Sequence, residues 1–196
     1  MHSLCIALKH IFTKITLIFR GKNNAETLQE RLEVLANNHY AILLLNYKWT
    51  TVYHCKWDMN TKPVCKVATE EKFLMANGIT SSADGKTVFV NDVLGMNIMA
   101  LSRDENTGLL SKKFDIPLPA LVDNIDYDDE ASEILLGSIV PGGLAVAVPE
   151  KDSWSVKGVL YHDEKKLKQI SVGARLGNSK IVLGTPFSEG ILVCNN

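Results

Sequence analysis

The sequence has no uninterrupted apolar run approaching 18 residues, which excludes a protein that crosses a membrane several times with helices. Its charges nearly cancel, with 21 Lys and Arg against 22 Asp and Glu, so no whole-chain field would attract nucleic acid. Aromatic residues make up only 7% of the chain, and its three tryptophans show no stacking pattern typical of nucleic-acid or sugar binding. We therefore expect no nucleic-acid partner.

Cysteine is also scarce. Four cysteines are too few for disulfides to hold together a fold of 196 residues. The sequence also has no CxxC pair, the spacing typical of a zinc site. Cys55 and Cys65 flank a turn-like segment between two short expected strands. A disulfide across this hairpin and two half-buried thiols are both compatible with the sequence.

The N-terminal segment differs in composition from the rest of the chain, because residues 1–22 carry four Lys or Arg residues and no acid. Its apolar residues recur at spacings of four and three, as on one face of a helix: Leu4, Leu8, Ile11, Ile15 and Ile18. The pattern predicts a basic amphipathic helix that contacts a membrane peripherally or acts in targeting. The alternatives are a helix packed on the body and a segment without stable structure. Basic residues interrupt the apolar stretch, so a cleavable signal peptide fits poorly. A second, short helix is expected from Glu26 to Leu35.

From about Tyr40 the chain shows short β-type runs separated by turns, of which the first are residues 41–45 and 50–54. Asp84-Gly85 lies between two apolar-patterned runs and predicts a hairpin with a type I′ turn, which requires positive φ. A helical repeat is disfavoured because several prolines and a Gly-Gly pair would break its helices.

One strand–turn–strand pattern recurs at an offset of 46 residues, with Ile79 matching Ile125, and a weaker third copy begins near Val172. Two further expected strands, residues 96–102 and 109–114, complete four strands per unit. A period in the forties with four short strands is typical of β-propeller blades. We therefore predict an all-β fold, a partial propeller of about three blades over residues 34–196 that follows a helical leader of residues 1–33.

A closed propeller typically has 4–8 blades, so three units by themselves are expected not to close a ring. Open sheet edges and an exposed apolar face would then favour self-association.

Polar residues precede the first strand of each unit. Asn77 and Asp123-Asn124 stand just before the matched apolar residues of two successive units, and Asn37-Asn38 offers the same chemistry upstream. Loops that lead into the innermost strands of a propeller converge on its central channel, so we expect these side chains to lie together. Amide and carboxylate oxygens without clustered Cys or His suit calcium rather than zinc. The alternative is that these residues only form Asx-turns.

Four motifs carry a resemblance to a known family; in chain order they are Ala36-Asn37-Asn38-His39-Tyr40, Met75-Ala76-Asn77-Gly78-Ile79 with Ser81–Lys86, Leu121-Val122-Asp123-Asn124-Ile125, and the closing run Leu183–Cys194. In this order, over residues 34–196, they resemble the serum paraoxonase/arylesterase family, particularly its fungal-type members. The resemblance implies a six-bladed propeller that hydrolyses aryl esters and lactones with a calcium ion in its central channel. It also implies a secreted or endomembrane location.

Carried over position by position, the resemblance implies that the ligands of the catalytic calcium ion are Asn37, Asn77, Asp123 and Asn124. Asn38 stands where the family has an aspartate for a second, structural calcium ion, and the amide should weaken that site. Cys194 matches a C-terminal cysteine that in the family pairs with one near the N-terminus, and nothing around Cys5 matches that partner.

Other parts of the family pattern have no counterpart before Asn37, namely an acidic pair of calcium ligands and the histidines assigned as the general base. Asp92 is a candidate for a further carboxylate ligand, with a strand-end aspartate as the alternative. The acidic residues from Asp126 to Glu133 are expected to form a solvated hairpin turn rather than a separate metal site. No catalytic residue is assigned.

Two functions follow. The first is a hydrolase of small aryl esters or lactones in which calcium polarises the ester carbonyl. The second is a catalytically weak or inactive propeller remnant that acts as an interaction or structural module.

Overall fold

The computed structural model describes residues 48–56, 62–140, 142–161, 169–177 and 179–195. In these ranges the chain forms four antiparallel sheets and no helix, so the all-β prediction is confirmed there. No helix in this part of the chain is therefore long and apolar enough to cross a membrane. The expected leader of residues 1–33 and the expected strand at 41–45 lie outside the described residues.

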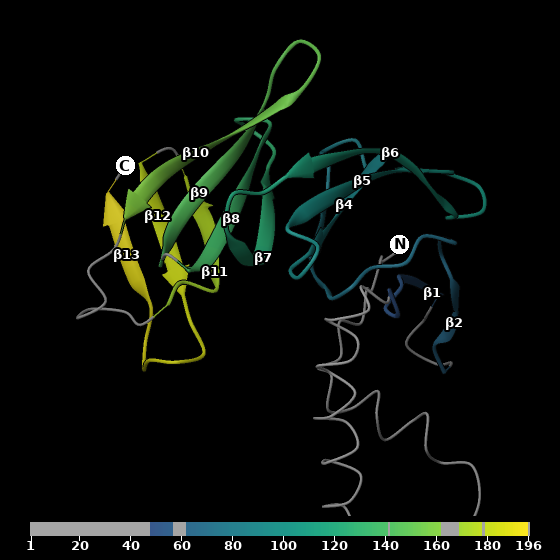
Figure 1. The fold of residues 1–196 in the computed structure, drawn as a ribbon, viewed down its shortest axis with the longest axis horizontal. Helices are drawn as coiled ribbons and strands as arrows, with labels where there is room; N and C mark the ends of the chain where they lie inside the picture. The colour runs from purple at the N-terminus through teal and green to yellow at the C-terminus, as the bar shows by residue number, and fades with distance from the viewer. Residues whose placement is uncertain (1–47, 57–61, 141, 162–168, 178, 196) are drawn as a thin grey trace, which may run out of the picture.

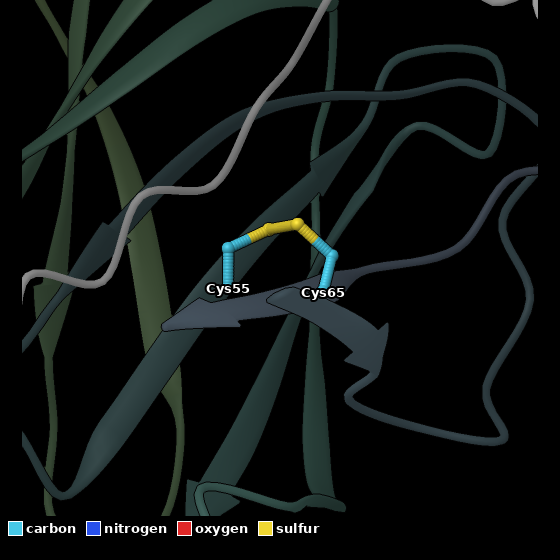
Figure 2. Close-up of a disulfide and its surroundings, with 2 residues drawn as sticks. All are labelled: Cys55 and Cys65. Carbon is cyan, nitrogen blue, oxygen red and sulfur yellow. A yellow bond between two sulfur atoms is a disulfide. The ribbon is translucent and has the colours of Figure 1, made fainter. Parts of the chain in front are cut away.

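The first sheet is a two-stranded hairpin of β1 (Tyr53–Lys56) and β2 (Val64–Val67). Cys55 and Cys65 lie directly opposite each other in it and form a disulfide (Figure 2). The sequence allowed either a disulfide or two half-buried thiols at these positions, and the structure has the disulfide. Cys194 forms no disulfide with any described cysteine.

The strand expected at residues 50–54 begins later than predicted. Thr50 instead forms an isolated bridge with Phe73, a fully buried residue in the segment that leads to the second sheet. The Thr50 hydroxyl donates to the Phe73 carbonyl at 3.0 Å and accepts from the Ala76 amide at 2.9 Å. These bonds satisfy backbone groups at Phe73 and Ala76, where the chain enters the second sheet, without a continuous ladder.

The other three sheets are meanders in which each strand pairs with the next along the chain. The second sheet contains β3 (Ala76–Ser81), β4 (Thr87–Asp92), β5 (Asn97–Arg103) and β6 (Leu110–Pro117). The third contains β7 (Leu121–Asp128), β8 (Glu133–Val140), β9 (Gly143–Pro149) and β10 (Trp154–Tyr161). The fourth contains β11 (Val172–Leu176), β12 (Lys180–Gly184) and β13 (Leu192–Asn195).

The repeat expected from the sequence is present in the pairing. Ile79 pairs with Val90 in the second sheet, just as Ile125 pairs with Leu136 in the third. The third copy coincides with β11 and β12, and the strands expected at residues 96–102 and 109–114 are β5 and β6. Strand periodicity and spacing therefore predicted these elements correctly.

The turn between β3 and β4 differs from the predicted type. Gly85 has a φ of +67°, but Asp84 does not have the positive φ that a type I′ turn requires at both positions. The loop is longer: the Gly85 amide donates to the Ser82 carbonyl, and the Ser82 amide to the Thr87 carbonyl. The Asp84 carboxylate accepts from the Ser82 hydroxyl, a bond that lowers the pKa of Asp84.

The first strands of the three larger sheets are neighbours, because β7 contacts both β3 and β11. In Figure 1, β7 lies at the edge of the third sheet that faces the second sheet. Successive side chains of a strand point to opposite faces of its sheet, so β8 contributes residues to two hydrophobic cores. Ile134 and Leu136 pack with Phe89 from the second sheet, and Leu135 packs with Leu183 from the fourth.

Aromatic rings fill the interface between the second and third sheets. The Phe89 ring stacks on Tyr127 at 5.8 Å and meets Trp154 edge-on at 5.6 Å. Trp154 therefore packs in the core between the two sheets.

Gly78 allows β3 to approach β7 closely. A Cβ atom at this position would lie 2.7 Å from the Ile125 amide nitrogen and 2.9 Å from the Asn124 Cα. Both are backbone atoms, so the strands would have to separate to admit a methyl group.

We expect Gly78→Ala to lower the free energy of unfolding by about 1–3 kcal/mol, the usual cost of overpacking. Gly173→Ala is the matched control in β11, because its methyl group would meet side-chain atoms of Leu144 and Leu183 rather than backbone atoms. Urea unfolding should show the larger loss for Gly78→Ala. Equal midpoints would contradict the close backbone packing.

Candidate metal centre

The predicted ligands lie where two neighbouring strands are irregular. The pairing of β3 with β4 shifts register between Ala76 and Ile79, and that of β7 with β8 between Val122 and Ile125. Asn77 lies in the first irregular stretch, and Asp123 and Asn124 lie in the second. Such β-bulges turn side chains away from the regular alternation of a strand and are common next to functional sites.

The Asp123 carboxylate joins these residues. The Asn77 amide Nδ2 donates to Asp123 Oδ1 from the neighbouring sheet. The Asn124 Nδ2 atom donates to Asp123 Oδ2 at 3.2 Å. The structure thus brings together three of the four predicted ligands, and Asn37 lies outside the described residues.

Ser171 is a member of this cluster that the sequence interpretation missed. Its hydroxyl donates to Asp123 Oδ2 and accepts from Asn124 Nδ2 at 3.1 Å. Its carbonyl accepts from the Asn124 backbone amide at 3.0 Å, and the residue is only 6% exposed. The weaker third copy carried the signal, because Ser171 precedes β11 as Asn124 precedes Ile125.

The cluster has one negative charge and otherwise neutral oxygen-bearing groups: amides from Asn77 and Asn124 and the hydroxyl of Ser171. Among the described residues, no group of three or more His, Cys, Asp or Glu side chains is arranged to hold a metal ion. Oxygen donors with a single carboxylate fit a hard cation such as calcium better than zinc.

Asp92 does not contribute a further ligand. It is 3% exposed, and its two carboxylate oxygens accept from the backbone amides of Leu74 at 2.9 Å, Met75 at 2.7 Å and Gly95 at 3.2 Å. The candidate ligand role was therefore wrong, and the strand-end alternative is correct. Its carboxylate instead fixes the segment that leads to Asn77.

The acidic residues from Asp126 to Glu133 form the hairpin that joins β7 to β8, as expected, but this hairpin is not fully solvated, because the Asp128 side chain is only 6% exposed. Asp128 Oδ1 accepts from the Glu130 and Ala131 amides, and Arg175 from β11 forms ion pairs with Asp128 and, at 3.0 Å, with Glu133. Sequence reasoning did not foresee Arg175, because the pairing joins two different sheets.

His54 is the one histidine in the described ranges. It lies in β1 and packs against Gly108 in the turn between β5 and β6. His39 and His162 lie outside the described residues, so the structure assigns no general base.

The family model described as Arylesterase matches residues 34–168, more than half of the chain, and its range contains Asn77, Asp123 and Asn124. The chain belongs to the paraoxonase/arylesterase family. The resemblance inferred from the four motifs is thereby confirmed.

Two relatives illustrate the extent of this membership. The chain is 32% identical over 163 residues to serum paraoxonase/lactonase 3 of Mus musculus, covering 76% of this chain and 44% of that protein. It is 35% identical over 167 residues to serum paraoxonase/arylesterase 2 of Canis lupus familiaris, covering 78% and 45%. The arylesterase-family chain thus spans about half the length of these relatives.

A solved structure of luciferin-regenerating enzyme has the same fold over 72% of this chain and 48% of its own length, with a TM-score of 0.53 and 14% identity. This likeness concerns the fold alone.

Asp126 lies in β7 two residues beyond Asn124 in this arylesterase-family chain. Burial raises the pKa of its carboxyl group above 3.8, and the charges of Asp128 and Asp129 raise it further. The folded state thus binds this proton more tightly than the unfolded state, so stability is lost as the pH rises through the folded pKa.

We expect Asp126→Asn to increase the stability at pH 7 and to have no such effect at about pH 3, where the carboxyl group is protonated in both states. Urea unfolding at the two pH values measures the difference. Asp152→Asn, in the exposed turn before β10, is the control and should change little. A gain that is equal at both pH values would contradict an ionisation effect.

Proposed function

We propose that this chain forms part of a six-bladed β-propeller hydrolase that acts on small aryl esters or lactones with a calcium ion. The metal would be held by Asn77, Asp123 and Asn124, with Asn37 as a fourth ligand. The convergence of the Asn77 and Asn124 side chains, from two sheets, onto the Asp123 carboxylate carries the proposal.

The arrangement of the sheets supports the architecture. Three antiparallel meanders place their first strands β3, β7 and β11 next to one another, as blades do around a channel. Three blades would be half of a six-bladed ring, and the chain spans 44% of the Mus musculus relative.

The donor set fits calcium, which takes six to eight oxygen ligands from carboxylates, amides and water. When bound, the ion would supply a Lewis acid that polarises the ester carbonyl and stabilises the developing oxyanion. Asp123 would provide the negative charge that attracts the cation. Ser171 would keep the Asp123 carboxylate in place through its hydroxyl, and Asn77 would connect the site to the second sheet.

A proton acceptor for the attacking water is the part of the mechanism for which no residue is assigned. General-base catalysis typically contributes 10²–10⁴-fold to a rate, so we expect slow hydrolysis by this chain alone. A single carboxylate ligand is also consistent with calcium binding in about the millimolar range.

The second candidate function is a module that associates with another copy of this chain. The last sheet and its β12–β13 loop expose large apolar side chains, with exposed fractions of 58% for Leu176 in β11 and of 58% for Phe187 and 69% for Ile191 in the loop. β13 is an edge strand of this sheet, and exposed apolar edges favour pairing between chains. The basic leader of residues 1–33 would add a peripheral membrane contact.

With a dissociation constant of about 1 mM, calcium at about 10 mM should raise the free energy of unfolding by roughly 1.4 kcal/mol. Asp123→Asn should abolish this gain because it removes the charge, and Asp152→Asn should retain it. Thermal unfolding with and without calcium measures both effects.

Hydrolysis of an aryl ester and of a lactone by the same samples should be barely above the buffer rate. Robust turnover at micromolar calcium that Asp123→Ala or Asn77→Ala abolishes would contradict the weak-site proposal and indicate a complete active site.

For self-association, sedimentation velocity of the full chain should show a concentration-dependent dimer. The double substitution Phe187→Ser with Ile191→Ser should weaken it by about tenfold or more, because two large apolar groups leave the interface. Leu109→Ser, at an exposed residue in the turn before β6, is the control. A monomer at all concentrations would exclude this function.

A further inference from the structure

Asn91 is a buried polar residue next to the candidate metal centre. It lies near the end of β4, pairs with Ile98 in β5, and has an exposed fraction of 0%. Its side-chain Nδ2 atom donates to the Val122 carbonyl at 2.6 Å and to the Asp123 carbonyl at 2.9 Å. One side chain of the second sheet thus binds two successive carbonyl groups of β7.

These two carbonyls lie at the start of the β7 bulge. The register shift between Val122 and Ile125 removes residues 123 and 124 from the regular ladder with β8, so their backbone groups need other partners. The Asn124 amide donates to the Ser171 carbonyl at 3.0 Å on the side of the fourth sheet. Asn91 supplies the bonds on the side of the second sheet, and the bulge is therefore held from both neighbours.

The neighbouring residue has a parallel role. Asp92 accepts from the Leu74 and Met75 amides and fixes the segment that leads to Asn77. Two consecutive residues at the end of β4 therefore hold both of the segments that carry candidate ligands.

The burial of Asn91 has a cost. Its Oδ1 atom has no hydrogen-bond partner among the described residues, and an unsatisfied buried polar group costs about 1–3 kcal/mol. A leucine of similar size would avoid this cost but would leave the two β7 carbonyls without their donor. The Asn91 side chain therefore stabilises the conformation of the bulge, although the burial of its Oδ1 atom lowers the local stability.

We propose that Asn91 is a positioning residue of the metal centre: it holds the Val122–Asp123 backbone so that the Asp123 and Asn124 side chains face Asn77. This inference rests on the proposed calcium function. Groups that orient metal ligands without touching the metal typically change its affinity by 10–100-fold when they are lost.

The test compares Asn91→Leu with Thr80→Val in the full chain. Thr80 is a matched control because its hydroxyl accepts from the Tyr127 amide at 3.0 Å, a hydrogen bond that also joins β3 to β7 but lies beyond the bulge. Isothermal titration with calcium chloride should give a dissociation constant about tenfold higher for Asn91→Leu and unchanged for Thr80→Val. Asn91→Ala, which adds no bulk, replaces Asn91→Leu if the leucine variant does not fold.

A second readout needs no metal. Amide hydrogen exchange at residues 123–125 should accelerate by about tenfold or more in Asn91→Leu and stay unchanged in Thr80→Val, because only the former releases the bulge. Unchanged exchange would overturn the proposal, as would an unchanged calcium affinity in a variant whose parent binds calcium. If the parent chain does not bind calcium at all, the proposed function itself falls, and the role of Asn91 in metal binding falls with it.

Discussion

The half-buried carboxylate of Asp123 is the group on which the candidate centre depends. It accepts hydrogen bonds from Asn77 in the second sheet, from Asn124 beside it, and from Ser171 just before the fourth sheet. These donors are all neutral, so they satisfy the oxygens of the carboxylate without cancelling its charge. A charge that is oriented in this way by three sheets is well placed to attract a cation.

The backbone around Asp123 is arranged by close approaches between sheets. Gly78 lets β3 lie against the backbone of Asn124 and Ile125, and Gly137 in β8 admits the backbone of Ser171. A side chain at either glycine would occupy the space through which the polar groups reach one another. The geometry of the centre is thus set by the packing of whole sheets as much as by its own side chains.

Much of this arrangement could be predicted from the sequence, because it follows from repetition. The recurrence of the pattern at Ile79 and Ile125 predicted equivalent strands, and the polar residues before them were correctly expected to meet. Contacts made by Asn91 and Arg175 were not predicted, since they depend on how neighbouring sheets pack rather than on local periodicity. Ser171 was missed although the weaker third copy of the pattern places it where the second copy has Asn124. The β3–β4 turn was assigned the wrong type because its dipeptide fits loops of several lengths.

The alternation along β8 has a consequence for how the molecule unfolds. Ile134 and Leu136 belong to the core shared with the second sheet, and Leu135 belongs to the core shared with the fourth. A register shift of one residue in β8 would turn the side chains of each core toward the other core and disrupt the packing of both. β8 therefore ties the three larger sheets into one cooperative unit, in which neither core can be lost without weakening the other.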